Sequence, residues 1–449
     1  MQARPILFII IALLSSSAFA TKMDLDTHTA VIEKLKVIVA DLDDDDASKV
    51  PSALRLADLL AERSRLKALK EVEQNCQNCL QAKEDRKFAV GYYNYTIPRL
   101  DGATRSNAML QKAHLLFSLG EIKETEKQYL QIINEGSRKH SATVLGQAHA
   151  SIGDFYFQRG NFKVAREHFE KALANNDTPQ KGLIHYRLSW CLFNLNKPNE
   201  AVAKMEMILK NPKMTEMLTS DGKIQQDESF KIDVSKDLAL FYASGTITRN
   251  TIERLMQISP ASQKQSNLFT LGTESDRLGK KKESAMVWMV YLENSPQDRE
   301  SLEPQIRLMK LKRDTGEVKA ALANFIHVGE LWKNPGCGEK CDDYKMLIRK
   351  FLTEWTKEEK KVKTTDLTQA YVIYAQIFPH DEDILFQAAS IAQNRGQFQQ
   401  AFGFYRAAAN ESYAKLKNPK DQNAEQIKTL QNIFEASLIG EIDMAETSK

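Results

Sequence analysis

Two pairs of closely spaced cysteines are the residues of this 449-residue chain whose spacing most directly suggests chemistry. Cys76 and Cys79 form a C-x-x-C sequence, and Cys337 and Cys341 form a second pair. Thiols this close can join in a disulfide or act as a redox couple. Structural disulfides are the first expectation in an oxidising compartment, and loops this short would fix a local turn more than the whole fold.

The surroundings of Cys76 and Cys79 do not favour the other uses of such a pair. A thioredoxin-like redox site needs the pair at the start of a helix that follows a strand, and no βαβ pattern surrounds it. Leu80 stands where covalent haem attachment needs a histidine. A four-cysteine zinc site would join pairs that are far apart in the chain. A thiol-redox role for Cys76 and Cys79 therefore remains only an alternative, and Cys191 is predicted to be a small buried apolar residue.

Signatures of catalysis fail on their spacing. Gly272 and Gly279 are separated by six residues where a phosphate loop needs four, and Lys281 replaces the Ser or Thr that would hold magnesium. The sequence has no H-E-x-x-H zinc motif and no G-x-S-x-G elbow, and its eight histidines show no ligand-like spacing. We therefore predict no catalytic residue, no metal site and no cofactor.

The first twenty residues have the form of a cleaved export signal. Arg4 precedes an apolar run from Ile6 to Leu14, and residues 18–20 match a small-residue cleavage site. We expect cleavage after Ala20 and a periplasmic or secreted protein. No later stretch is apolar enough to span a bilayer, so no transmembrane segment is expected after cleavage.

The composition excludes nucleic acid as an expected partner. The formal net charge is only +3, and the 27% of charged residues are mixed in sign along most of the chain. The roughly 430 residues that remain after cleavage are too many for one ordinary globule. We therefore expect several domains or one extended solenoid.

Residues 147–177 carry small and aromatic residues at fixed offsets, namely Gly153, Tyr156, Gly160, Ala165, Phe169 and Ala172. This segment resembles the tetratricopeptide repeat, a unit of two antiparallel helices. The resemblance implies that Gly153 lets the helices approach, Tyr156 fills the gap and Gly160 permits the turn. The family's early Trp position is His149 here.

The same register recurs near the C-terminal end, at Ala389, Gly396, Ala401, Tyr405 and Ala408. Weaker copies lie between, including one with Ala113, Leu116, Gly120, Tyr129 and Ile132, one with Ser189, Leu192, Ala201, Met205 and Ile208, and one with Gly272, Gly279, Trp288, Tyr291 and Pro296. Successive registers are about 34 to 40 residues apart, as stacked helical hairpins require. The resemblance covers most of residues 107–411.

The resemblance implies an all-α fold, a right-handed superhelical α-solenoid of helical hairpins, whose ends need capping helices. Arg55, Arg63, Arg65 and Lys67, on the predicted N-terminal cap helix 51–72, are interpreted as exposed stems on its surface. We divide the chain into a signal peptide (1–20), an N-terminal helical and capping region (21–104), repeats (105–213), a polar insertion (214–229), degenerate repeats (230–411) and a C-terminal capping helix and tail (412–449).

In the resembling family, set positions of each first helix line a concave groove that holds a protein partner. Mapped onto this chain, and joined by the neighbouring Arg187, the groove residues are His114, Phe117, Asp154, Phe157, Tyr186, Arg187, Trp190 and Phe193. Their aromatic and Arg content is typical of interface anchors, although the same side chains could instead pack between repeats.

These observations predict a non-catalytic scaffold that mediates protein–protein interaction in a bacterial envelope assembly, such as one for motility, secretion or surface assembly. The partner is a protein of unknown identity. A self-assembling structural element is the other alternative, and a homo-oligomer is compatible with the sequence, since Val31, Leu35, Ile38 and Leu42 could form a short seam.

Overall fold

The computed structural model describes residues 24–74, 76, 80–219, 223–295, 298–359, 365–419 and 422–447. The predicted signal peptide lies outside these residues. The described chain is helical except for one short β-hairpin, and it separates into two compact units that meet in sequence between Leu195 and Asn196. None of the described helices has both the length and the apolar character that crossing a membrane requires.

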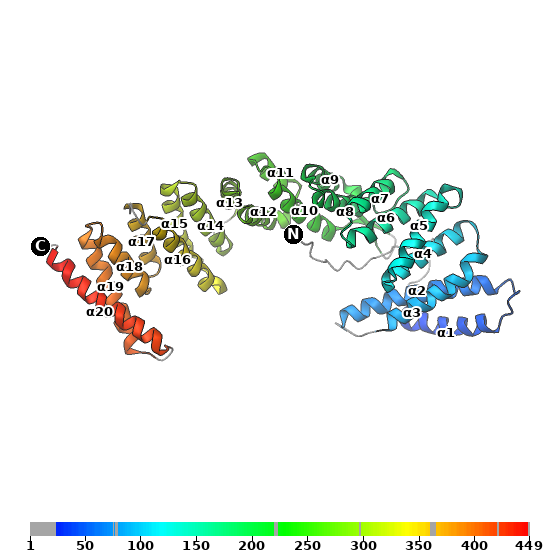
Figure 1. Cartoon of the computed structure of the whole chain (residues 1–449), viewed down its shortest axis with the longest axis horizontal. Coiled ribbons are helices and arrows are strands. Elements are labelled where there is room, and N and C mark those ends of the chain that lie inside the picture. Colours follow the sequence, from blue (N-terminus) through cyan, green and yellow to red (C-terminus); the bar gives the residue numbers. More distant parts are fainter. Residues whose placement is uncertain are drawn as a thin grey trace. The chain divides into compact units, whose positions relative to one another are not determined.

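The first unit consists of consecutive helices that each pack against the next, drawn from blue to green in Figure 1. Alternate helices also touch, since α4 contacts α6 and α6 contacts α8. The hairpins therefore stack in chain order. The helices are α1 (Leu25–Asp41), α2 (Lys49–Glu73), α3 (Gln81–Thr96), α4 (Gly102–Leu119), α5 (Ile122–Glu135), α6 (Ala142–Gln158), α7 (Phe162–Ala174) and α8 (Lys181–Asn194).

The second unit continues the same alternation of helices and short turns (Figure 1). Neighbouring hairpins again touch, for example through α10 and α12 and through α15 and α17. Its helices are α9 (Pro198–Lys210), α10 (Glu228–Ser244), α11 (Arg249–Ile258), α12 (Lys264–Arg277), α13 (Lys281–Asn294), α14 (Leu302–Asp314), α15 (Val318–Lys333), α16 (Cys341–Glu358), α17 (Thr365–Ile377), α18 (Glu382–Gln393), α19 (Phe398–Lys417) and α20 (Ala424–Thr447).

Short elements join these helices. The residues assigned to a polar insertion contain strands β1 (Glu216–Leu218) and β2 (Ile224–Gln226), which pair antiparallel with Glu216 opposite Gln226. Single turns of 3-10 helix are η1 (Ile97–Arg99), η2 (Gly136–Arg138), η3 (Pro212–Thr215), η4 (Ala261–Gln263), η5 (Arg299–Ser301) and η6 (Gly338–Lys340).

Glycines end the first helix of several hairpins. Gly120, Gly160, Gly279, Gly316 and Gly396 all have positive φ angles between 71° and 87°. Residues with a Cβ adopt this left-handed conformation at a cost, whereas glycine does not, so it is the usual residue just past a helix end. The chain can therefore reverse direction within two to four residues and begin the second helix.

A small residue faces a large aromatic one across the two helices of a hairpin, and the two are 16 residues apart in sequence. A Cβ on Gly153 would lie 2.7 Å from the ring of Phe169, and one on Gly272 would lie 2.6 Å from the ring of Trp288. Both rings are buried. The same close approach is thus built into both units, since the missing side chain makes room for the ring.

Replacing Gly153 with valine is expected to destabilise the first unit by about 1–3 kcal/mol, because the new side chain overlaps the buried Phe169 ring. Thermal melting followed by circular dichroism measures the effect. Gly91, whose Cβ would meet nothing within 4 Å, is the matched control in the same unit. Unchanged melting of the Gly153 variant would contradict the close packing of the two helices.

The interpretation of Arg63 as an exposed stem is wrong. Its side chain is only 7% exposed, and its guanidinium donates to both carboxylate oxygens of Asp85 on α3, at 2.8 and 2.6 Å. Lys67 approaches the same carboxylate, with its Nζ 2.8 Å from Oδ2. A basic side chain can be buried in this way because a carboxylate on the neighbouring helix neutralises it.

Candidate partner-binding face

The predicted groove residues all lie on α4, α6 and α8, three alternate helices of the first unit. Each of these helices buries one side in the core, as Ile152 and Phe155 show for α6. The opposite side carries residues that are half-buried, so the three helices together present one continuous face. We call this surface the α4–α6–α8 face.

Polar contacts connect the three helices along this face. His114 on α4 and Ser151 on α6 are hydrogen-bonded, with Nε2 and Oγ 3.0 Å apart. Asp154 on α6 and Arg187 on α8 form an ion pair of 3.3 Å, and their side chains are 30% and 15% exposed. These contacts fix the relative positions of groups that a partner could reach.

Aromatic side chains make up the rest of the face. Phe117 meets Phe155 edge-on with ring centroids 6.0 Å apart, and Trp190 and Phe193 make a similar contact at 6.0 Å. The Arg187 guanidinium lies over the ring of Phe157, 5.3 Å from its centroid. Phe117, Phe157, Trp190 and Phe193 are all half-buried, so each ring is held in place and still offers part of its surface.

Tyr186 does not belong to this face. Only 2% of its surface is exposed, so the prediction that it contacts a partner is wrong. The repeat register places it on the groove side, but α8 turns that side chain into the packed interior. The other predicted groove residues keep exposed surface in the structure.

Burial shapes the charge states on the face. Burial raises the pKa of the Asp154 carboxyl, and the nearby Arg187 opposes this effect. Burial lowers the pKa of His114 from 6.5 to about 4. Its Nδ1 is buried and has no hydrogen-bond partner, so nothing there would stabilise the protonated ring. At neutral pH the face therefore presents a neutral imidazole beside an ion pair.

Acidification is expected to destabilise the first unit through His114. The pKa of His114 is lower in the folded state than in the unfolded state, so protonation favours unfolding. The contribution of the neutral imidazole to the free energy of unfolding is therefore complete above about pH 6.5 and is lost as the pH falls toward 4. The loss amounts to roughly 3 kcal/mol for a shift of this size. Urea unfolding at several pH values measures it. A His114→Gln variant should lose stability less steeply below pH 6.5, and an identical pH profile would contradict the assignment.

The cysteines fall into three environments. Cys337 and Cys341 are joined in a disulfide, with Cα atoms 4.9 Å apart, in the turn that leads into α16. Cys76 is also disulfide-bonded, whereas Cys79 lies outside the described residues. Cys191 is a free buried thiol, and burial raises its pKa to about 12. A thiol with so high a pKa is not nucleophilic at neutral pH.

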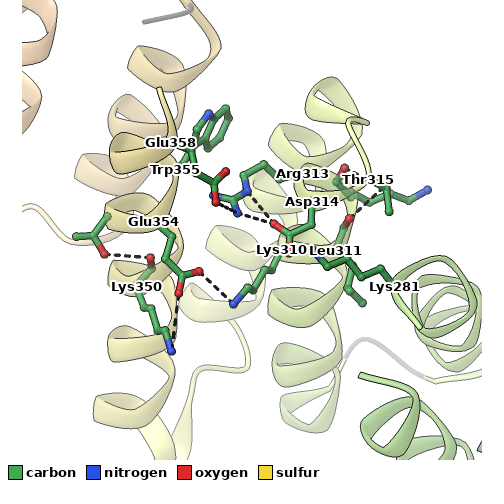
Figure 2. Close-up of polar contacts among 12 residues, drawn as sticks. Lys281, Lys310, Leu311, Arg313, Asp314, Thr315, Lys350, Glu354, Trp355 and Glu358 are labelled. Atoms are coloured by element: carbon green, nitrogen blue, oxygen red, sulfur yellow. Dashed lines mark hydrogen bonds and ion pairs between the residues drawn. The ribbon is translucent and has the colours of Figure 1, made fainter. Parts of the chain in front are cut away.

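In the second unit, ion pairs join the neighbouring helices α13, α14 and α16 (Figure 2). Lys310 on α14 lies 3.1 Å from Glu354 on α16, and Arg313 lies 3.3 Å from Glu358. Lys281 on α13 reaches Asp314 at 3.2 Å.

Two shallow hollows occur elsewhere on the described surface. One runs along α5 and is lined by charged residues such as Lys123 and Glu126. The other is apolar and lies between α17 and α19, near Leu385 and Phe404. Neither includes a predicted groove residue.

The structure also brings together two histidines that sequence spacing did not pair. His149 on α6 and His168 on α7 place their Nδ1 atoms 3.0 Å apart. They are 19 residues apart in the chain, and only the hairpin brings them face to face. Within the described residues, no set of three or more His, Cys, Asp or Glu side chains is placed to hold a metal ion.

Comparison with known proteins identifies one segment clearly. Residues 146–178, which form most of α6 and α7 and the turn before α8, match the family model of the tetratricopeptide repeat. No curated protein is similar enough in sequence to the chain to count as a match.

Several solved structures are similar in helical architecture. The C-terminal part of a TPR repeat-containing protein from Cytophaga hutchinsonii is 14% identical, with 62% of this chain and 98% of that one covered and a TM-score of 0.27. The apo quorum sensor NprR from B. thuringiensis is 12% identical, with 78% and 97% covered and a TM-score of 0.32. The TPR2AB domain of yeast Sti1 in complex with pHSP90 is 14% identical, with 65% and 98% covered and a TM-score of 0.25. At these values the similarity does not bear on function.

Proposed function

From the tetratricopeptide repeat that this chain carries at residues 146–178, we propose that the protein is a non-catalytic scaffold that holds a protein partner on the α4–α6–α8 face. Tetratricopeptide repeats are protein-interaction modules, and stacking of their hairpins exposes one side of each first helix. The partner is a protein segment whose apolar side chains pack on Phe157, Trp190 and Phe193.

The aromatic row beside a fixed ion pair is the observation that carries this proposal. Trp190 and Phe193 contact each other edge-on, and Arg187 is held between Asp154 and the Phe157 ring. Rings and guanidinium groups that are already positioned lose little conformational freedom on binding, and such residues dominate interface energetics. The side chains are thus prepared for a partner before it arrives.

The site of action in this proposal is the bacterial envelope. The basic residue, apolar run and small-residue motif within residues 1–20 support export, and the disulfide between Cys337 and Cys341 suits an oxidising compartment. Mass spectrometry of the protein purified from its native host tests this part directly. A mature chain that begins after Ala20 is expected, and an intact N-terminus in the cytoplasmic fraction would contradict it.

Partner capture can be localised with a photocrosslinking amino acid. Placed at position 193, on the α4–α6–α8 face, it should join the protein to its partner in the native envelope, and mass spectrometry then identifies the adduct. Placed at position 88, where Phe88 is 57% exposed on α3, it serves as the matched control. The same adducts from both positions would contradict the proposed face.

Replacing Trp190 with alanine is expected to weaken binding of that partner by tenfold or more, since a central aromatic anchor contributes about 2 kcal/mol or more. The melting temperature should change little, because Trp190 is only half-buried. Calorimetric titration and thermal melting measure the two quantities. The buried Tyr186→Ala variant should show the reverse, a lower melting temperature. A loss of stability in the Trp190 variant as large as its loss of affinity would make it a core residue.

A further inference from the structure

His149 and His168 meet across the hairpin of α6 and α7. Their Nδ1 atoms are 3.0 Å apart and their ring centroids 5.2 Å apart, so the two nitrogens face each other almost directly. One ring must donate an Nδ1 proton to the other at this distance. Both side chains are half-buried, so the pair also reaches solvent.

Neighbouring residues hold the pair in place. The ring of Tyr156 stacks on His168, with centroids 5.8 Å apart and planes within 14° of parallel. The Tyr156 hydroxyl donates to Glu126 on α5 at 2.5 Å, which fixes the tyrosine in turn. These contacts hold His168 beside His149.

The hydrogen-bonded pair offers what a metal ion needs from histidine. The ring that accepts the hydrogen bond at Nδ1 is a neutral imidazole with a lone pair on that nitrogen. Neutral imidazole is the preferred nitrogen ligand of late first-row metal ions.

We propose that His149 and His168 form a two-histidine chelate for a divalent ion of the late first-row metals, with Cu²⁺ bound most tightly. If an ion lies about 2.05 Å from both nitrogens at their present separation of 3.0 Å, the nitrogen–ion–nitrogen angle is about 94°. That angle is close to the 90° between neighbouring ligands in the tetragonal sites that Cu²⁺ prefers.

Binding requires two small local changes. Each ring turns about its Cβ–Cγ bond, a torsion with broad minima, so that its lone pair points at the ion instead of at the other ring. The ring that donates the hydrogen bond moves its proton from Nδ1 to Nε2, so no proton is released. Because no third His, Cys, Asp or Glu among the described residues completes the site, water fills the other coordination positions.

Titration of the full-length protein with CuCl₂ at pH 7 tests the proposal by isothermal calorimetry. One equivalent should bind tightly, and NiCl₂ and ZnCl₂ should bind more weakly. His149→Gln and His168→Gln should each weaken binding by tenfold or more, because loss of a direct ligand costs at least as much as loss of an outer-sphere partner. His327→Gln, at a histidine on α15 whose side chain is 57% exposed, should bind like the wild type.

Two further measurements exclude misfolding as the cause. His149→Trp, which places the residue usual in the family at this position, removes one ligand while filling the hairpin, and it should lose the site but keep its helical spectrum. Cu²⁺ should also raise the melting temperature of the wild type reversibly with EDTA, because it joins α6 to α7 in the native state. The proposal would be overturned if the folded wild type did not bind Cu²⁺. It would also be overturned if the His149→Gln, His168→Gln and His149→Trp variants bound Cu²⁺ as tightly as the wild type.

Discussion

Replacing Asp85 with alanine is expected to lower the free energy of unfolding of the first unit by about 3–5 kcal/mol. The change leaves the Arg63 guanidinium, 7% exposed, without the carboxylate that receives its two hydrogen bonds. Arginine cannot lose its charge at ordinary pH, so the buried cation stays unpaired. Urea unfolding followed by circular dichroism measures the effect.

A control and a rescue make this result specific. Glu33→Ala removes an exposed ion pair with Lys36 on α1, and it should leave stability nearly unchanged. The double variant Arg63→Met and Asp85→Leu replaces both charges by apolar groups of similar size and should recover most of the loss. If Asp85→Ala unfolds like Glu33→Ala, the buried pair does not stabilise the N-terminal helices.

The Asp85 carboxylate also adds to stability in a pH-dependent way. Burial alone would raise its pKa, but hydrogen bonds from Arg63 and Lys67 outweigh burial and hold the pKa below its usual range. An acid with a lowered folded pKa stabilises the protein above its unfolded pKa and loses that contribution as the pH falls through the folded one. Acid therefore acts on the first unit through both Asp85 and His114.

Replacing Trp288 with alanine is expected to destabilise the second unit by about 3–5 kcal/mol, since it empties the space of a fully buried indole. The indole packs edge-on against Phe269 and Tyr291, with ring centroids 5.3 and 6.0 Å away, and its Nε1 donates to Asp276 at 3.3 Å. Thermal melting and urea unfolding measure the loss. The half-buried Trp190 supplies the comparison, since Trp190→Ala should cost far less.

The effect of a second change in the same hairpin on stability should have opposite signs in the wild type and in the Trp288→Ala variant. Gly272→Leu is expected to destabilise the wild type, because its Cβ would lie 2.6 Å from the Trp288 ring. In the Trp288→Ala background the same leucine fills the vacated space and should restore stability. If the two changes are simply additive, Gly272 and Trp288 are not the complementary pair that the structure shows.

Much of the helical architecture could be predicted from the sequence, because its signals are local. A small residue and a turn glycine recur at fixed offsets, as Gly153 and Gly160 show, and the turn glycine adopts the expected positive φ. The repeat register expected Tyr156 to fill the gap at Gly153, but the ring of Phe169 occupies it. A helix repeats every 3.6 residues and a turn needs only a few, so one hairpin is encoded within about 34 residues. Neighbouring hairpins then follow from the shared apolar face.

The candidate face could be predicted only in part. The repeat register states which way a residue points from its own helix, and this was enough to place Asp154, Trp190 and Phe193 on partly exposed surface. It was not enough for Tyr186, which is 2% exposed. How far a helix rotates against its neighbour depends on the side chains of both helices, and a single register does not contain that information.

What the amino-acid sequence by itself determined about this protein is the helical hairpin and its turn glycine, because these depend on residues close in the chain. Only the tertiary structure decided which charges and rings meet between helices. Arg63 contacts Asp85, and His149 contacts His168, although the residues of each pair lie on separate helices and have no characteristic spacing in the sequence. Such pairs form because packing brings two helices to one distance and rotation, and that choice is made by the whole core at once.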